Sequence, residues 1–181
     1  DFRWGVTLAM NFDEISVNIF DGVGRASALP ILTATSAMQE LYYIPLLSWL
    51  EEFALDLGDG TTFKPFDTGY AYRMAETLRA QGYDIPTDHD ALIDMFGIGC
   101  WKYAPDVAEK LFIKAGLEKR ADGWYFEGQP FTINMTYLAD TEAQAGRGLI
   151  AAYDQLVKFG FNCNLASESS ATWDSNAATG N

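Results

Sequence analysis

The alternation of apolar and polar positions is clearest over residues 101–166, where it predicts a helix, a hairpin, a strand, a helix and a strand. The first helix is predicted to begin at Pro105, because proline suits the first helical turn. It is predicted to stop at Gly116, because glycine readily adopts the left-handed conformation that ends helices. Apolar side chains recur between them at the spacing of one helix face: Val107, Ala108, Leu111, Phe112 and Ala115.

The residues after this helix predict a βαβ unit. Turn-forming residues at 122–130 predict a hairpin, and strict alternation of apolar and polar side chains then predicts a half-buried strand over 131–138. A second helix is predicted over 141–159 and a second strand over 161–166. The apolar face of this predicted helix is formed by Leu149, Tyr153, Leu156 and Val157. Because the connections are short, the two strands should lie parallel with the helix as their crossover.

The rest of the chain predicts helices. Residues 1–32 predict two short helices, with Asn11 and Glu14 forming a capping box at the second. Residues 33–99 predict an insert that is helical throughout apart from a turn and a short extended piece at 62–67. Its first helix, over 37–57, should be interrupted at Pro45, because proline cannot continue a regular helix without a kink.

Composition limits the classes of function. The 181 residues, 49% hydrophobic and 14% aromatic, predict one packed domain rather than a disordered chain. A net charge of −13 with 12 scattered basic residues argues against nucleic acid and acidic membrane surfaces as partners. Two cysteines leave a disulfide open, although Cys163 in a predicted strand is more simply explained as a small buried side chain.

The chain predicts no metal, cofactor or catalytic triad. Asp56, Asp59 and Asp67 lack the ligand spacing of a calcium loop, and the acidic residues around His89 are explained by helix capping. With a single histidine and no Gly-x-Ser-x-Gly motif, a serine triad has no basis. Two carboxylates that converge in space remain an open alternative.

The aromatic residues carry the strongest functional signal. Broad, flat rings stack on pyranose sugars and form pockets for peptide side chains. Trp4 and Trp124 are expected to pack inside the scaffold. The candidates for ligand contact are the aromatic residues in or beside the insert and one near the C-terminus: Tyr42, Tyr43, Trp49, Trp101 and Trp173.

Two stretches resemble a known family. Residues 103–117, followed by Asp122-Gly123-Trp124 and Gly128-Gln129-Pro130, resemble the pattern "YDPekAkelLkeAG … dGw … dGkpf". Residues 3–15 are similar to "vRwALtlAInrdei". Both patterns belong to the large extracytoplasmic solute-binding proteins of ABC importers, extracellular solute-binding family 5, which take up oligopeptides, nickel or oligosaccharides. Ala104 departs from the family, which usually has aspartate before this proline.

The resemblance implies an α/β fold: one lobe of a two-lobe periplasmic-binding-protein fold of class II type, with a small mixed sheet flanked by helices and a helical insert. The chain would be an internal fragment of a longer protein, with a helical start at 1–32, the insert at 33–99 and a helix-hairpin-βαβ unit at 100–181. The location implied is periplasmic, or extracytoplasmic as a membrane-anchored lipoprotein.

The function implied is capture of an oligosaccharide or oligopeptide by hinge closure and its delivery to membrane permease subunits, without covalent chemistry. The tryptophans of the insert favour an oligosaccharide. Two alternatives are a small carbohydrate-active hydrolase domain and a non-catalytic interaction domain. The first needs two carboxylates about 5–9 Å apart in a cleft. The second needs a large exposed apolar patch without a cleft.

Overall fold

The computed structural model describes residues 1–30, 36–138 and 143–179. Its helices are α1 (Phe2–Ala9), α2 (Phe12–Phe20), α3 (Ser36–Met38), the π-helix η1 (Gln39–Tyr43), α4 (Ile44–Glu52), α5 (Tyr70–Ala80), α6 (His89–Phe96), α7 (Pro105–Lys114), α8 (Ala143–Phe159) and α9 (Ser170–Thr179). Its strands are β1 (Leu55–Asp56), β2 (Thr62–Phe63), β3 (Phe66–Asp67), β4 (Cys100–Trp101), β5 (Leu117–Arg120), β6 (Gly123–Phe126), β7 (Gln129–Pro130), β8 (Thr132–Leu138) and β9 (Asn162–Glu168).

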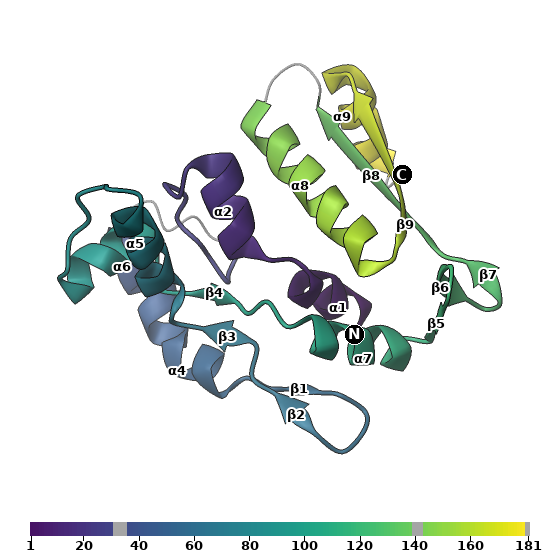
Figure 1. Cartoon of the computed structure of the whole chain (residues 1–181), viewed down its shortest axis with the longest axis horizontal. Coiled ribbons are helices and arrows are strands. Elements are labelled where there is room, and N and C mark those ends of the chain that lie inside the picture. The colour runs from purple at the N-terminus through teal and green to yellow at the C-terminus, as the bar shows by residue number, and fades with distance from the viewer. Residues whose placement is uncertain (31–35, 139–142, 180–181) are drawn as a thin grey trace.

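Two helices from distant parts of the sequence form the centre of the molecule. α1 and α7 lie side by side, with α8, β8 and β9 on one flank and α4, α5, α6 and the short strands β3 and β4 on the other (Figure 1). The close approach of α1 and α7 depends on Gly5, because a Cβ atom there would lie 2.6 Å from the ring of Phe112. The two stretches that resemble the same family therefore pack together.

The βαβ prediction is confirmed. β8 and β9 pair in parallel, with Thr132 opposite Asn162 and Leu138 opposite Glu168, and α8 packs on both strands. The predicted face of α8 is wrong at one position, because Val157 is 43% exposed while Leu156 is buried. Val157 turns away because the buried face of the helix runs through Ala152 and Leu156 instead.

The predicted hairpin is part of a three-stranded antiparallel sheet. β6 pairs with β7 across a turn at Glu127 and Gly128, both with positive φ, as a tight hairpin requires. β6 also pairs with β5, from Leu117 opposite Phe126 to Arg120 opposite Gly123. The strand β5 was not predicted, because its exposed polar residues give no alternating pattern.

Capping of α2 follows half of the prediction. The Asn11 side chain accepts a hydrogen bond from the Glu14 N–H at 3.2 Å. The reciprocal bond of a capping box is replaced, because the Asn11 N–H donates to Oε1 of Gln155 at 2.7 Å. Gln155 Nε2 donates back to the Asn11 carbonyl at 3.3 Å. This pair of bonds attaches the start of α2 to the C-terminal half of α8.

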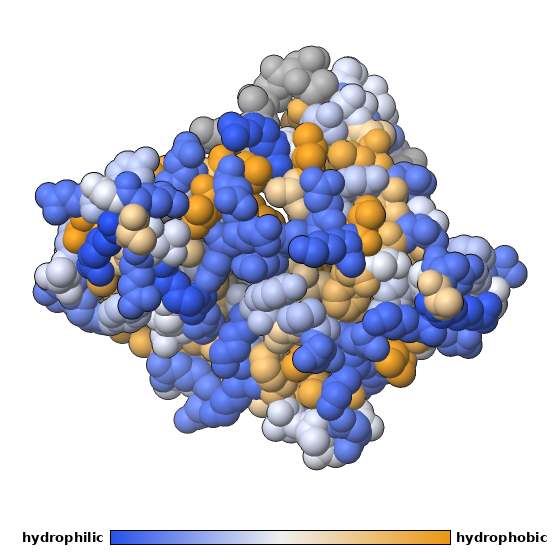
Figure 2. Space-filling view, viewed as in Figure 1, coloured by the Kyte–Doolittle hydropathy of each residue, from blue (hydrophilic) through white to orange (hydrophobic). Residues whose placement is uncertain are grey.

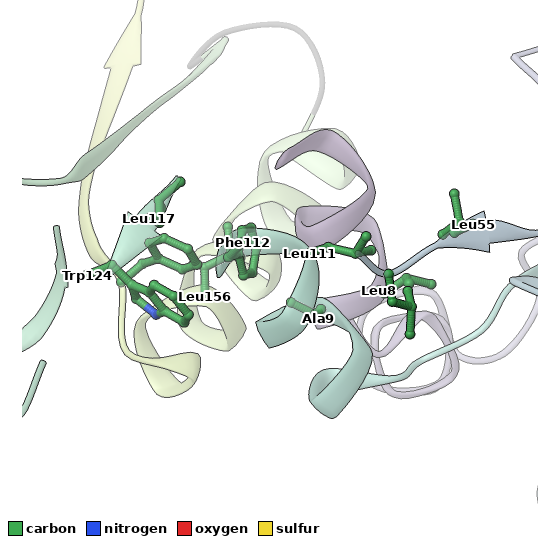
Figure 3. Close-up of a cluster of buried hydrophobic side chains, with 11 residues drawn as sticks. Leu8, Ala9, Leu55, Leu111, Phe112, Leu117, Trp124 and Leu156 are labelled. Atoms are coloured by element: carbon green, nitrogen blue, oxygen red, sulfur yellow. The ribbon is translucent and has the colours of Figure 1, made fainter. Parts of the chain in front are cut away.

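The largest core cluster lies around α7. Phe112 is fully buried among aromatic rings, including those of Trp124 and Phe161. The cluster extends from Trp124 and Leu117 at one end to Leu8 and Leu55 at the other (Figure 3). It therefore joins the βαβ unit to the β1–β2 hairpin through α1 and α7.

The extended piece predicted at 62–67 is confirmed, since β2 and β3 lie within it, but the insert also contains β1 where a helix was predicted. The helix predicted over 37–57 ends at Glu52, since Phe53 has an extended ψ of 128°. Leu55–Asp56 then pairs antiparallel with Thr62–Phe63. Likewise β3 pairs with β4, with Phe66 opposite Trp101. In the turn between β1 and β2, Gly58 and Gly60 have φ of 82° and 83°, which allows the chain to fold back.

The predicted interruption at Pro45 takes the form of a π-turn. α3, η1 and α4 form one continuous helix from 36 to 52, and the Ile44 N–H donates to the Gln39 carbonyl, five residues back. Proline lacks the N–H of a regular helix, and its ring crowds the carbonyl four residues earlier. The wider turn before Pro45 accommodates this ring without ending the helix.

Candidate functional site

A cavity of about 370 Å³ lies between α2, the segment after it, and the region where α5 and β4 meet. This volume falls within the range of small-ligand pockets, about 300–1,000 Å³. Its wall is mostly apolar, with one charged side chain, that of Arg25. The lining residues are Phe12, Ile15, Ser16, Phe20, Gly24, Arg25, Ala26, Ser27, Tyr70, Cys100 and Trp101.

Polar bonds hold the walls of this cavity together. Arg73 of α5 donates to Asp13 of α2 at 2.5 Å and to Asp67 of β3 at 2.7 Å. The hydrogen bond that Arg73 donates to Asp13 is the main cause that raises the pKa of Arg73, so its guanidinium stays charged. The Tyr70 hydroxyl donates to Oγ of Ser16 at 2.8 Å. These bonds fix α2 against α5 and β3.

The ionisable groups that line the cavity, apart from Arg25, are neutral at pH 7. Burial, together with the smaller effect of the charges of Asp67 and Asp13, raises the pKa of the Cys100 thiol to about 12. Burial also raises the pKa of the Tyr70 phenol to about 12. A thiol that stays protonated is a weak nucleophile. The cavity is therefore suited to binding rather than to thiol chemistry.

Arg25 is held in an unusual environment. Its Nε and Nη2 atoms are buried without a hydrogen-bond partner within the described part of the chain. Its nearest ionic neighbour is Asp94 of α6, whose Oδ1 lies 3.8 Å from Nη2, beyond hydrogen-bonding distance. Arg25 is not among the residues predicted from sequence, because a single arginine after a glycine-rich turn carries no motif.

The structure brings two of the predicted aromatic residues together. Trp49 and Trp101 are the ends of a run of rings in which Phe53 and Trp4 are the links. Successive ring centroids are 5.2, 5.4 and 4.8 Å apart. Trp101 also lines the cavity, so this aromatic run, formed by Trp49, Phe53, Trp4 and Trp101, connects the cavity to the surface of α4.

An apolar stripe follows the exposed side of η1 and α4. Trp49 is 52% exposed and Tyr42 is 44% exposed, so both present ring surface to a ligand. The exposed apolar side chains of the stripe are Met38, Leu41, Tyr42, Leu46 and Trp49. Met38, Tyr42, Leu46 and Trp49 are spaced by three or four residues, which puts them on one side of the helix, and Leu41 borders them.

Tyr43 and Trp173 lie apart from this stripe. Tyr43 is fully buried, and its hydroxyl hydrogen-bonds to Oγ of Ser27 and accepts from the Leu29 N–H. In this position its ring packs in the core and has no free face. Trp173 lies in α9 beyond β9, far from α4 in the fold (Figure 1). Other apolar side chains reach the surface in small patches between polar ones (Figure 2).

The acidic clusters considered in the sequence have structural partners. Asp88 caps α6 by accepting a hydrogen bond from the Ala91 N–H at 3.0 Å, as the capping interpretation predicted. His89 bonds to the Tyr72 hydroxyl. In residues 1–30, 36–138 and 143–179, no three His, Cys, Asp or Glu side chains are placed to hold a metal.

Cys100 and Cys163 are free thiols packed against different core clusters.

Comparison with known proteins gives similarity at the level of structure. No family model matches the chain, and no curated protein matches it. NikA from Brucella suis, solved in complex with Fe(III)-EDTA, superposes with a TM-score of 0.57 at 13% identity, covering 99% of this chain and 25% of its own. The oligopeptide-binding protein AppA from Bacillus subtilis, solved with a nonapeptide, superposes with a TM-score of 0.54 at 14% identity, covering 97% and 24%.

The chain has the fold of part of these binding proteins. It spans about a quarter of their length. AppA is an oligopeptide-binding protein, and oligopeptides are one of the ligand classes of the family that the sequence motifs resemble. The predicted α/β class is confirmed, with strands that form small separate sheets, antiparallel or parallel, among the described residues.

Proposed function

We propose that this chain is part of one lobe of an extracytoplasmic solute-binding protein, which captures an oligosaccharide or an oligopeptide and delivers it to ABC permease subunits. The observation that carries the proposal is the structural likeness to NikA and AppA, which extends over 99% and 97% of the chain. Neither superposition depends on a short shared motif. In this proposal, the solute lies between two lobes and closure of a hinge encloses it.

The surface of the chain fits this role. The apolar stripe exposes Trp49 and Tyr42, and the aromatic run joins Trp49 to the cavity beside Trp101. Exposed rings that continue into a cavity suit a ligand with several units, because each unit can pack on a different ring. We therefore assign ligand contacts to Tyr42, Trp49 and Trp101.

The parallel pair β8–β9 supports a larger parent protein. Parallel sheets are almost always covered on both faces. α8 packs on this pair, yet none of the described residues of β8 or β9 is fully buried. Further chain over the pair would complete its burial.

Among the described helices, none is long and apolar enough to cross a membrane.

A thermal-shift screen of the longer protein against short peptides and oligosaccharides tests the proposal. A ligand that binds only the folded state raises the free energy of unfolding by about 2.7 kcal/mol at a hundredfold excess over Kd. We expect a shift with one of the two panels. Absence of a shift with both would contradict the proposal and favour the hydrolase or interaction-domain alternatives.

Variants identify the surface that the ligand contacts. Trp49→Ala should reduce the shift produced by the active panel, because it removes an exposed ring from the stripe. Tyr83→Ala is the matched control, since Tyr83 is 57% exposed but lies after α5, outside the stripe. Equal loss of the shift in both variants would contradict the assignment of the stripe.

A further inference from the structure

The unpaired edge of Arg25 requires an acceptor. Nε and Nη2 together form one edge of the guanidinium plane, and this is the edge that a carboxylate can occupy with two parallel hydrogen bonds. Both atoms are buried and have no hydrogen-bond partner among the described residues. A buried donor without an acceptor is destabilising, and such groups in native proteins usually mark an unseen water, ion or ligand.

The surroundings of Arg25 favour an anion. Arg25 is the one charged residue in the lining of the cavity. Asp13 and Asp67 are bonded to Arg73, and Asp94 lies 3.8 Å from Nη2 of Arg25, beyond hydrogen-bonding distance. The Ser16 hydroxyl accepts the proton of Tyr70, so its own proton is left to donate to an acceptor in the cavity. Both side chains can therefore donate to one anionic group.

The rest of the cavity favours an apolar body behind that anion. Its wall contains the side chains of Phe12, Ile15, Phe20 and Trp101. Aromatic and branched aliphatic groups bury well against such a surface, whereas a strongly polar group would lose its hydration without compensation. A simple inorganic anion would leave most of the 370 Å³ unfilled.

We propose that this cavity binds a carboxylate that carries an aromatic or branched aliphatic group. The carboxylate pairs with the Nε–Nη2 edge of Arg25, after a rotation of this side chain, which is 24% exposed. The apolar group occupies the space beside Trp101. The inference rests on the proposed function in that the carboxylate is part of the captured solute, either a free acid or the C-terminal residue of a peptide.

Titration of the 181-residue chain followed by NMR tests this site. N-acetylphenylalanine has the proposed features, and its C-terminal amide keeps the same apolar group but lacks the negative charge and one acceptor oxygen. For ligands of this size we expect a Kd of about 1 mM for the acid, and at least about tenfold weaker binding for the amide. The signals expected to shift are those of Gly24, Ala26 and the Trp101 indole N–H. Equal binding of acid and amide would overturn the proposal.

Two further ligands separate the two sources of the carboxylate. 3-Phenylpropionate represents a free acid and Ala-Ala-Phe represents a peptide C-terminus. Tighter binding of 3-phenylpropionate indicates a free acid, and tighter binding of the tripeptide indicates a peptide; either result supports the site. N-acetylalanine should bind more weakly than N-acetylphenylalanine, because it lacks the large apolar group. Absence of shifts around the cavity with all four acids at 10-fold above the expected Kd would overturn the inference.

Variants assign the effect to Arg25. Arg25→Gln should weaken binding of N-acetylphenylalanine at least about tenfold, and Arg25→Lys less, because lysine keeps the charge without the planar edge. Arg120→Gln is the control, since it removes the same charge from an exposed arginine that pairs with Glu118 in the hairpin. Unchanged affinity in a folded Arg25→Gln variant would contradict the site.

Failure of the carboxylate site can be distinguished from failure of the proposed function. If the longer protein binds a peptide or sugar while Arg25→Gln leaves that affinity unchanged, the cavity is not the carboxylate site and the proposed function stands. If the acid binds at Arg25 but neither solute panel shifts the longer protein, the carboxylate site stands and the importer role fails.

Discussion

Replacing Phe112 by alanine is expected to lower the free energy of unfolding by about 3–5 kcal/mol. The ring is fully buried and lies 4.8–5.6 Å, centroid to centroid, from four other rings: Phe2, Trp124, Phe159 and Phe161. These rings come from α1, β6 and the region where α8 leads into β9. Truncation would leave a cavity where the two family-like stretches meet, and rigid neighbouring rings would close it poorly.

Urea denaturation followed by circular dichroism measures this loss. Ile113→Ala is the matched control, because Ile113 is the next residue of the same helix and is 54% exposed. The control should change the free energy of unfolding by less than about 1 kcal/mol. Similar losses in the two variants would show that the face of α7 assigned to the core is wrong.

Gly97→Ala is expected to cost about 3 kcal/mol or more. Gly97 has φ 93° and ψ 165°, a conformation that residues with a side chain rarely adopt. A Cβ atom there would lie 2.3 Å from the carbonyl oxygen of Ala26. The obstacle is backbone, and it is fixed nearby by the hydrogen bond from the Ala26 N–H to the Phe96 carbonyl at 3.0 Å. The two backbone segments at residues 26 and 97 would have to move apart, and Ala26 lines the cavity.

Gly82→Ala separates backbone strain from steric contact. Gly82 has nearly the same φ, 91°, but no described heavy atom lies within 4 Å of where its Cβ would be. We expect this variant to lose about 1–2 kcal/mol, from strain alone. If thermal or urea unfolding gave the two glycine variants the same stability, the close contact between residues 26 and 97 would be contradicted.

The elements with local signals could be predicted from sequence. α7 begins at Pro105 and its buried residues fall at the predicted positions, because proline, glycine and the apolar period all act within one helix. The parallel pairing of β8 with β9 follows from the short connections of the βαβ unit. In each case the sequence pattern and the tertiary packing favour the same structure.

An extended piece at 62–67 was predicted, but β1 and the pairing of the insert's strands could not be, because each strand is only two residues long. A strand of this length shows no alternation, and Leu55–Asp56 directly follows a helix with a matching apolar period. The pairing of β3 with β4 depends on contact between residues more than 30 positions apart. Such long-range contacts leave no signal in the local pattern.

The candidate site was predictable in part. Aromatic richness pointed to η1 and α4, where the structure exposes Tyr42 and Trp49. It could not distinguish Tyr42 from Tyr43, since adjacent residues of a helix face different surroundings and only the packed structure shows which side is covered. Arg25 was missed because its environment is formed by α2, α5 and β4, which come together only in the fold.

The affinity of the 181-residue chain for the solute that stabilises the longer protein tests the two-lobe proposal most directly. With the contacts of the opposite lobe removed, we expect the chain alone to fold and to bind this solute at least about a hundredfold more weakly than the longer protein, by calorimetric titration. Micromolar or tighter binding by the chain alone would contradict the proposal that the solute is held between two lobes.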